Sequence, residues 1–214
     1  MTVDVKICGC TDEAAVAAAR EAGAMFVGFV MYPPSPRNLS PEHARALLDA
    51  EGGAIAPLAV AVTVDADDAQ LARIVDTLAP NLLQLHGEEP PERVADVRAR
   101  FGVPVMKAVA IAEASDLDRA ERHAEVADRL LFDAKPPKDE LPGGNARSFD
   151  WSLLTGRAWR VPWLLSGGLT PDTVAAAVRA SGAPGVDVSS GVEAERGVKD
   201  ADAIHAFLEQ TRGV

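Results

Sequence analysis

The chain has 214 residues, of which 48% are hydrophobic and 25% are charged, as is usual for a folded globular domain. This composition excludes a disordered chain, a collagen and a coiled coil, and no apolar run approaches the ~18 residues of a membrane span. The net charge of −11, without a visible basic patch, argues against a nucleic-acid partner, because phosphate backbones repel an acidic protein. The N-terminus lacks a basic region followed by an apolar run, so we expect no signal peptide and a cytoplasmic location.

Short apolar runs alternate with segments of helical period through the first half of the chain. We expect strands at Val3–Cys8, Phe26–Met31, Leu58–Val64 and Leu82–Leu85. We expect helices at Asp12–Ala22, from Ser40-Pro41, at Asp67–Leu78, and from Pro90-Pro91 to about Arg100. Gly23 is placed to end the first helix, Ser40 to cap the second and Asp65 to cap the third, since these residue types are favoured at such positions.

The same alternation continues in the second half of the chain. We expect strands at Val103–Val109, Leu130–Asp133, Trp163–Ser166 and Val186–Ser189. We expect helices at Ser115–Ala124, from Thr170-Pro171 to Gly182 and at Asp200–Gln210, with a short helix around Asp150–Leu154. The long polar connection Lys135–Arg147 contains three proline and two glycine residues, and a loop of this length in a compact domain is usually functional.

Eight strand–helix units in 214 residues leave roughly 27 residues for each unit, close to the minimum. Strands that alternate with helices predict a parallel sheet, and eight such units predict closure into a (β/α)8 TIM barrel of the α/β class. An open doubly wound sheet is the alternative, but no Gly-x-Gly-x-x-Gly turn follows the first strand. No linker or shift in composition divides the chain, so we expect residues 1–214 to form a single domain.

Glycines and small hydroxyl residues follow the last two expected strands, at Gly167-Gly168 and at Ser189-Ser190-Gly191. Before a helix, such residues let backbone N–H groups point at an anion, and phosphate sites recur at these two loops in barrels. The alternative is that the glycines only permit tight turns between strand and helix. Because both loops match within one barrel, we expect a phosphorylated small molecule to bind there.

Cys8 and Asp133 lie at the ends of the first and sixth expected strands, where the active site of a barrel is built. A thiol has an ordinary pKa of ~8.5, close enough to neutrality to be tuned into a thiolate base. A carboxylic acid can act as a general acid where burial or a neighbouring charge keeps it protonated. Each residue also has a structural alternative: Cys8 as a small buried hydrophobe, and Asp133 as a helix cap or a partner of Lys135.

No metal site is predicted from the sequence. The two cysteines are too few for a structural zinc site, and Cys10 is expected only to pack. The four histidines lie in different elements and show no His-x-x-x-His spacing. We expect His86, at the end of a strand, to line the pocket, and we expect the three on helices, His43, His123 and His205, to face solvent.

Six groups of residues, in order from residue 6 to residue 200, together resemble the phosphoribosylanthranilate isomerase family of tryptophan biosynthesis. They are Lys6-Ile7-Cys8-Gly9; Gly28-Phe29-Val30 with Ser35-Pro36-Arg37; Gln84-Leu85-His86-Gly87; Gly143-Gly144 with Phe149-Asp150-Trp151; Ser166-Gly167-Gly168-Leu169; and Asp187-Val188-Ser189-Ser190-Gly191-Val192-Glu193 with Lys199-Asp200. No single group is decisive, but their conjunction over nearly the whole chain is specific.

The resemblance implies a (β/α)8 barrel and an Amadori rearrangement that needs no cofactor or metal. In this reaction N-(5-phosphoribosyl)anthranilate becomes 1-(2-carboxyphenylamino)-1-deoxyribulose 5-phosphate. Asp133 would be the general acid that protonates the furanose ring oxygen, and Cys8 the general base at C2 of the resulting Schiff base. Arg37 would pair with the anthranilate carboxylate, and Asp187 and His86 would contact the sugar or the aromatic end.

The phosphate of the substrate would be held by the two loops already singled out, through Gly167, Gly168, Ser189, Ser190 and Gly191. The protein would be a monomer or a homodimer with a small-molecule substrate, and we expect neither nucleic acid nor membrane as a partner. Lys135–Arg147 would act as a lid over the labile intermediate. In that segment the chain reads Gly143-Gly144-Asn145-Ala146, where the family often has Thr-Gly after the glycine pair.

Two alternatives remain at this point. Another phosphosugar isomerase on the same barrel would need a different constellation: an epimerase needs metal-binding histidines with paired aspartates, and indole-glycerol-phosphate synthase needs a lysine and a glutamate. A non-catalytic barrel that binds a phosphorylated ligand would be expected to have lost Cys8 or Asp133, and both are present.

Overall fold

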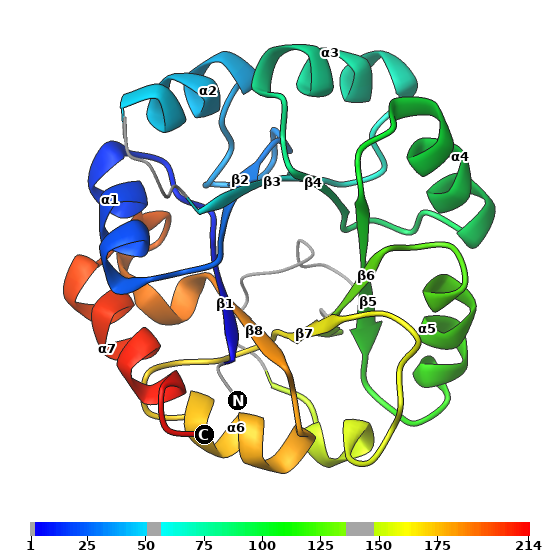
Figure 1. Cartoon of the computed structure of the whole chain (residues 1–214), viewed down its shortest axis with the longest axis vertical. Coiled ribbons are helices and arrows are strands. Elements are labelled where there is room, and N and C mark those ends of the chain that lie inside the picture. Colours follow the sequence, from blue (N-terminus) through cyan, green and yellow to red (C-terminus); the bar gives the residue numbers. More distant parts are fainter. Residues whose placement is uncertain (1–2, 51–56, 136–147) are drawn as a thin grey trace.

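The computed structural model describes residues 3–50, 57–135 and 148–214. Eight parallel strands form a closed barrel in chain order, so the expected (β/α)8 barrel is confirmed (Figure 1). The strands are β1 (Asp4–Cys8), β2 (Phe26–Val30), β3 (Leu58–Thr63), β4 (Leu82–Leu85), β5 (Val105–Ile111), β6 (Arg129–Ala134), β7 (Trp163–Leu165) and β8 (Gly185–Val188). The barrel closes where β8 pairs with β1, from Asp4 opposite Gly185 to Ile7 opposite Val188.

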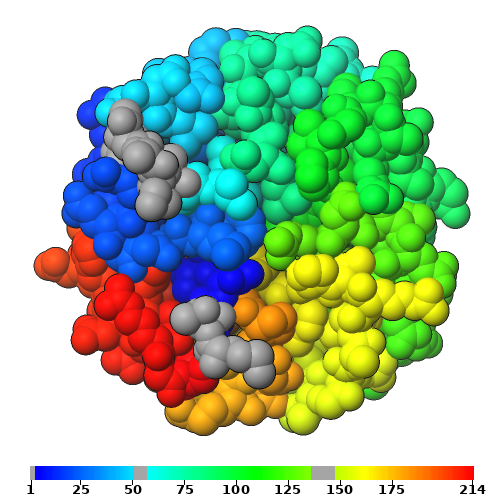
Figure 2. Space-filling view, in the orientation of Figure 1, coloured from blue at the N-terminus to red at the C-terminus, as the bar shows by residue number. Residues whose placement is uncertain are grey.

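Helices surround the barrel and follow one another around it (Figure 1). They are α1 (Glu13–Ala22), α2 (Pro41–Ala50), α3 (Asp68–Leu78), α4 (Pro91–Phe101), α5 (Asp116–Ala124), α6 (Val174–Ser181) and α7 (Ala201–Thr211), with the 3-10 helices η1 (Trp151–Leu154) and η2 (Ser190–Val192). The first and last helices, α1 and α7, pack against each other, and Figure 2 shows the blue and red ends of the chain side by side. Within the described ranges, no helix has the length and apolar character to cross a membrane.

The strands carry two different hydrophobic surfaces, as expected for a parallel barrel covered by helices. One set of buried side chains, including Phe26, Val62, Met106 and Leu131, fills the inside of the barrel. The larger set faces outward and packs against the helices. Successive residues of each strand therefore alternate between the barrel interior and the helix layer.

One expected helix cap and one expected helix start are wrong. Asp67, not Asp65, caps α3, because its carboxylate accepts a bond from Gln70 N (2.8 Å). Asp65 has a left-handed backbone (φ 48°), and its carboxylate instead accepts a bond from Glu88 N in the loop after β4. The helix expected from Thr170-Pro171 begins only at Val174, since residues 171–173 form a turn.

The short hairpin of β9 (Glu193–Glu195) and β10 (Val198–Lys199) was not expected from the sequence. Its turn uses Gly197, whose φ of 91° is one that residues with a side chain rarely adopt. Thr11 Oγ1 donates to Gly197 O (3.3 Å), which ties the hairpin to the loop after β1. The hairpin thus joins the end of the barrel strand β8 to the loops after the first two strands.

His123 was expected to face solvent, and the structure shows this to be wrong, because only 3% of it is exposed. Its Nδ1 atom is buried without a hydrogen-bond partner among the described residues. Burial, together with the charges of Lys107 and Arg119, lowers the pKa of His123 to about 4. His43 and His205 are exposed, as expected.

This lowered pKa predicts a specific loss of stability in mild acid. The unfolded chain binds a proton on His123 near pH ~6.5, whereas the folded chain binds it only near pH 4, so the free energy of unfolding falls as pH drops between these values. His123→Gln removes this contribution, and its unfolding free energy from urea titrations should fall less between pH 7 and pH 5 than that of the wild type. His205→Gln, at an exposed histidine, should fall as the wild type does. Equal slopes for all three proteins would contradict the assignment.

Candidate active site

Cys8 and Asp133 lie at the same end of the barrel, at the C-terminal ends of β1 and β6. Cys8 is 8% exposed and Asp133 is 6% exposed, so both lie at the mouth of the barrel interior. The sequence pattern predicted that a thiol and a carboxyl group lie at the same mouth of the barrel, and the structure confirms this placement.

The thiol of Cys8 shares the space beside Gly28 of β2 with the ammonium group of Lys6. A Cβ atom on Gly28 would lie 3.0 Å from Cys8 Sγ and 3.1 Å from Lys6 Nζ, so a larger residue would displace both groups. Burial raises the pKa of the Cys8 thiol, and the adjacent Lys6 ammonium acts in the opposite direction by favouring the thiolate. The second thiol, Cys10, is fully buried, and burial raises its pKa to about 12, which agrees with a packing role.

Lys6 is fully buried inside the barrel, two residues before Cys8 on β1. Its Nζ donates to Asp187 Oδ1 of β8 at 2.8 Å, and Ser166 Oγ donates to the other oxygen, Oδ2, at 3.1 Å. Burial alone would lower the pKa of Lys6, but the contacts with Asp187 and Cys8 outweigh burial and raise it above the ordinary value. Asp187, which the sequence reasoning assigned to substrate contact, therefore has both carboxylate oxygens engaged by protein groups.

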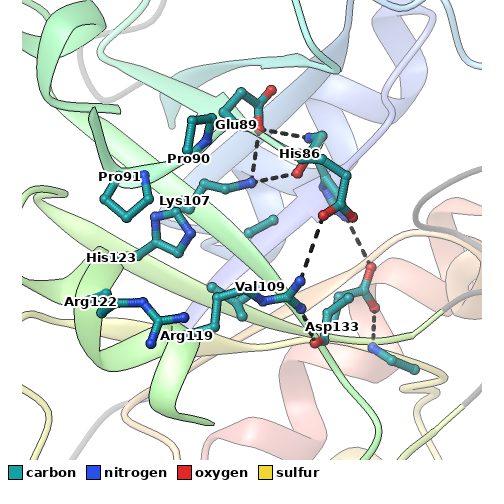
Figure 3. A pocket seen from close by; sticks show the side chains of 15 residues that line it. His86, Glu89, Pro90, Pro91, Lys107, Val109, Arg119, Arg122, His123 and Asp133 are labelled. Carbon is teal, nitrogen blue, oxygen red and sulfur yellow. Dashed lines mark hydrogen bonds and ion pairs between the residues drawn. The ribbon is translucent and has the colours of Figure 1, made fainter. Parts of the chain in front are cut away.

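Asp133 is held by two hydrogen bonds at the end of β6. Its Oδ1 accepts from Ala134 N (2.9 Å), and its Oδ2 lies 3.2 Å from His86 Nε2. The other imidazole nitrogen, Nδ1, lies 2.8 Å from Gln84 Nε2, two residues earlier on β4. A dashed line joins His86 and Asp133 in Figure 3, which shows them beside a cavity of about 250 Å³. The structure thus brings together His86 and Asp133, which were predicted as separate site residues.

Arg37 is buried in the loop after β2, where it forms an ion pair with Glu193 of the hairpin. Its Nε donates to Oε1 (2.6 Å) and its Nη2 to Oε2 (2.8 Å). Gly9 leaves room for the arginine stem, because a Cβ on Gly9 would lie 2.5 Å from Arg37 Cδ. Burial of Glu193 is outweighed by its bonds to Arg37 and Lys199, which lower the pKa of this carboxyl group to about 2.

The two loops predicted to bind phosphate lie in direct contact. Gly167 and Gly168 both have left-handed backbones (φ 90° and 65°). Gly191 lies against the loop after β7 so closely that a Cβ atom would be 1.8 Å from Leu169 O. Lys199 Nζ donates to Ser189 O (3.1 Å) and braces the second loop. This geometry agrees with an anion site formed jointly by the two loops, and phosphate binding there stays a prediction.

One buried lysine of the barrel faces away from the mouth, and one expected feature of the site lies outside the described residues. Lys107 points away from the barrel interior, where its Nζ bonds to Glu89 Oε2 (2.8 Å) and Gly87 O (2.7 Å). The expected lid falls largely on residues 136–147, including Gly143-Gly144-Asn145-Ala146, which lie outside the described residues. In the part of the chain that the structure describes, no group of three or more His, Cys, Asp or Glu side chains could hold a metal ion.

The sequence analysis named three polar residues of the site within its motifs but gave them no role: Lys6, Gln84 and Glu193. Lys6 and Gln84 each precede a predicted site residue by two positions on a strand, so the period of two would have placed them beneath Cys8 and His86. Glu193 carries no comparable signal, because its contact with Arg37 depends on how the hairpin folds over the loop after β2.

Comparison with known proteins agrees with this arrangement. Residues 5–210 match the family described as PRAI, N-(5'phosphoribosyl)anthranilate (PRA) isomerase. The chain belongs to this family. It is 56% identical to N-(5'-phosphoribosyl)anthranilate isomerase of Paramagnetospirillum magneticum, over 100% of this chain and 99% of that protein.

Two solved structures of family members match this chain over nearly its full length. Each match covers 99% of this chain and 100% of the chain in the solved structure. One is phosphoribosyl anthranilate isomerase from Thermotoga maritima, with 38% identity and a TM-score of 0.87. The other is a phosphoribosyl anthranilate isomerase in complex with reduced 1-(o-carboxyphenylamino)-1-deoxyribulose 5-phosphate, with 36% identity and a TM-score of 0.84. The barrel of this chain is therefore the barrel of the family.

The contact of Lys6 with Cys8 predicts that this ammonium stabilises the thiolate. Lys6→Met should raise the pKa of Cys8, because it removes the adjacent positive charge that favours the thiolate. The rate of alkylation by iodoacetamide as a function of pH, with Cys8 and Cys10 resolved by mass spectrometry, measures this pKa. The double variant Lys6→Met/Asp187→Asn avoids leaving an unpaired buried carboxylate if the single variant does not fold.

Lys107→Met is the matched control, since Lys107 is also a buried lysine paired with a carboxylate, but outside the barrel interior. It should leave the pKa of Cys8 unchanged. An unchanged pKa of Cys8 in the Lys6 variants would show that burial alone determines the state of the thiol.

Proposed function

We propose that this chain catalyses the Amadori rearrangement of N-(5-phosphoribosyl)anthranilate to 1-(2-carboxyphenylamino)-1-deoxyribulose 5-phosphate in tryptophan biosynthesis. The observation that carries the proposal is a thiol and a carboxyl group at one mouth of a family barrel, each with polar partners that act on its proton. The relative solved with a reduced form of the same product supports this choice of substrate.

In the first step, Asp133 donates its proton to the ring oxygen of the furanose. The bond between this oxygen and C1 breaks, while the lone pair of the anilino nitrogen forms a C1=N double bond. The result is an open-chain, protonated Schiff base and an ionised Asp133. His86 Nε2 and Ala134 N lie on the two carboxylate oxygens, where they stabilise this negative charge.

In the second step, the thiolate of Cys8 removes the proton from C2 of the Schiff base. The electrons of the C2–H bond form a C1=C2 double bond and neutralise the nitrogen, so the positive nitrogen acidifies C2 and a thiolate is a sufficient base. The enol then loses the proton of its 2-hydroxyl group to solvent and receives at C1 the proton that Cys8 removed from C2, which gives the ketone and restores the thiolate. Asp133 takes up a proton from solvent in place of the one it donated, so no proton is consumed overall.

Arg37 would bind the anthranilate carboxylate through the edge that Glu193 leaves open. Glu193 engages Nε and Nη2, and no described residue accepts a bond from Nη1. A planar guanidinium fixed at one edge presents its remaining donors in a defined plane, which suits a planar carboxylate. The loops at Gly167-Gly168 and Ser189–Gly191 would hold the phosphate at the other end of the substrate.

The cytoplasmic location and the monomeric or homodimeric state stay predictions from the sequence.

The function itself is tested by adding purified protein to phosphoribosylanthranilate and following the loss of its fluorescence. We expect a rapid loss that depends on protein concentration. No loss above the spontaneous rate would refute the proposal.

Removal of either proposed catalytic group should lower kcat. Asp133→Asn and Cys8→Ser should each reduce it by roughly 10²-fold or more, the usual contribution of a general acid or base. Two matched controls should keep kcat near the wild-type value. One is Asp128→Asn, at the residue before the first residue of β6 and thus at the other end of the strand from Asp133, and the second is Cys10→Ala. Normal turnover by a Cys8 or Asp133 variant would remove that residue from the mechanism.

Loss of the arginine should act on substrate binding. Arg37→Ala should raise KM by about 10-fold or more with a smaller effect on kcat, because it removes a charge-assisted contact made in both ground and transition states. Glu193→Gln keeps the arginine but weakens its anchor, and KM should rise less. Steady-state kinetics measure both effects, and an unchanged KM in Arg37→Ala would place the carboxylate elsewhere.

A further inference from the structure

Gln84 is a fully buried polar side chain near the mouth of the barrel, and the proposed reaction leaves it without a role. Its carboxamide nitrogen Nε2 lies 2.8 Å from His86 Nδ1. Its carbonyl oxygen Oε1 is buried and has no hydrogen-bond partner among the described residues. Because a buried, unpaired carbonyl is unfavourable, an amide at this position requires an explanation.

The position of His86 explains why an amide matters there. Gln84 and His86 are two residues apart on one strand, so both face the barrel interior, and the imidazole lies between the amide and Asp133. Each ring nitrogen thus has one partner: Nδ1 faces Gln84, and Nε2 faces Asp133 Oδ2 at 3.2 Å. If Gln84 donates a hydrogen bond to Nδ1, the proton of a neutral imidazole is on Nε2, which then donates to Asp133. If Gln84 accepts a hydrogen bond from Nδ1, Nε2 is free to accept a proton from Asp133.

We propose that Gln84 is a positioning residue that sets which nitrogen of His86 carries a proton, and thereby whether Asp133 holds the proton it delivers to the substrate. This inference rests on the proposed function. Two arrangements of the three side chains follow from the donors and acceptors of each group, and they differ by one proton.

In the arrangement of the structure, the amide N–H of Gln84 donates to Nδ1. Nδ1 is then without a proton, Nε2 carries one, and Nε2–H donates to an ionised Asp133. This is the resting state of the free protein and also the state that follows proton delivery, so Asp133 has to take up a proton from solvent before each turnover.

In the other arrangement, the carboxamide has turned by half a rotation, and Oε1 accepts from a protonated Nδ1. The nitrogen and oxygen ends of an amide have nearly the same shape, so this exchange moves no backbone. Asp133 and His86 Nε2 then share one further proton, which is the one available to the substrate. The orphaned Oε1 gains its partner in this state.

The charges around His86 do not make this choice by themselves. The cavity beside His86 and Asp133 is lined by Glu88, Glu89, Lys107, Arg119, Arg122 and His123 (Figure 3). Lys107 is paired with Glu89, and Arg119 lies near Glu88, so acidic and basic groups oppose each other there. Among the described residues, Gln84 is the one in hydrogen-bond contact with Nδ1.

The imidazole nitrogen shifts of the 15N-labelled full chain, recorded at neutral pH, test the proposal directly. The wild type should show a protonated Nε2 and a bare Nδ1 on His86. Gln84→Glu replaces the donor with an acceptor and should produce a protonated Nδ1. Gln84→Met keeps the size of the side chain but gives Nδ1 no partner, and the two singly protonated forms should mix. Gln70→Met, at an exposed glutamine of α3, should leave the nitrogen shifts of His86 unchanged.

Kinetics of the same variants separate positioning from packing. Gln84→Met should lower kcat by about 10-fold or more, the usual cost of losing a residue that orients a catalytic group, with KM within about twofold of the wild type. Gln84→Glu, which keeps an acceptor for Nδ1, should retain more of kcat than Gln84→Met. Circular dichroism shows whether a variant is folded, and Gln84→Glu provides the test if Gln84→Met is not.

Three results would overturn the proposal: nitrogen shifts of His86 that do not change in either Gln84 variant, a lower kcat without any change in these shifts, or changed shifts with a normal kcat. Failure of the proposed function gives a different result, namely a wild type that does not convert phosphoribosylanthranilate. In that case the nitrogen shifts still decide whether Gln84 sets the position of the proton on His86.

Discussion

The chemistry of this site depends on the period of two in a closed parallel barrel. Alternate residues of each strand face the interior, so every side chain at the mouth stands above the residue two positions earlier. Lys6 lies beneath Cys8 in this way, and Gln84 lies beneath His86. Buried polar groups must find partners, so the second layer is tied to the first by hydrogen bonds and ion pairs. The groups proposed to face the substrate are consequently held by the residues beneath them.

The surroundings of the two groups proposed to transfer protons, Cys8 and Asp133, differ in kind. Beneath the thiol there is the full charge of Lys6. Asp187 keeps that charge in place by accepting a bond from it, and Ser166 donates to the other oxygen of Asp187. A fixed cation favours the thiolate against the effect of burial. Beside the carboxyl group there is instead a neutral chain of an amide and an imidazole, which can hold a proton in either of two arrangements. The proposed base, Cys8, needs a constant neighbouring charge that keeps its thiol ionised. The proposed acid, Asp133, must be protonated again in each cycle, so its neighbours have to allow both its protonated and its ionised form.

The hairpin after β8 organises the end of the site where we propose that the anthranilate carboxylate binds. Glu193 on this hairpin holds Arg37 from the loop after β2, and a Cβ atom on Gly197 would lie 3.2 Å from Pro36 O in the same loop. The first and last units of the chain are neighbours because the barrel closes between β8 and β1. One edge of the guanidinium is thus fixed by residues more than 150 positions away in the sequence.

The sequence by itself determined the order of the elements, the eightfold repeat, and which residues end the strands, because hydrophobic period and turn residues are local signals. It therefore placed Cys8, His86 and Asp133 at one mouth. It misjudged His123, the cap of α3 and the start of α6, where local patterns permit more than one outcome. Only the tertiary structure decided three contacts of the site. The ammonium group of Lys6 lies beside Cys8, hydrogen bonds connect Gln84 through His86 to Asp133, and Glu193 forms an ion pair with Arg37. These contacts join separate strands and loops, and they exist only once closure of the barrel has brought the strand ends together.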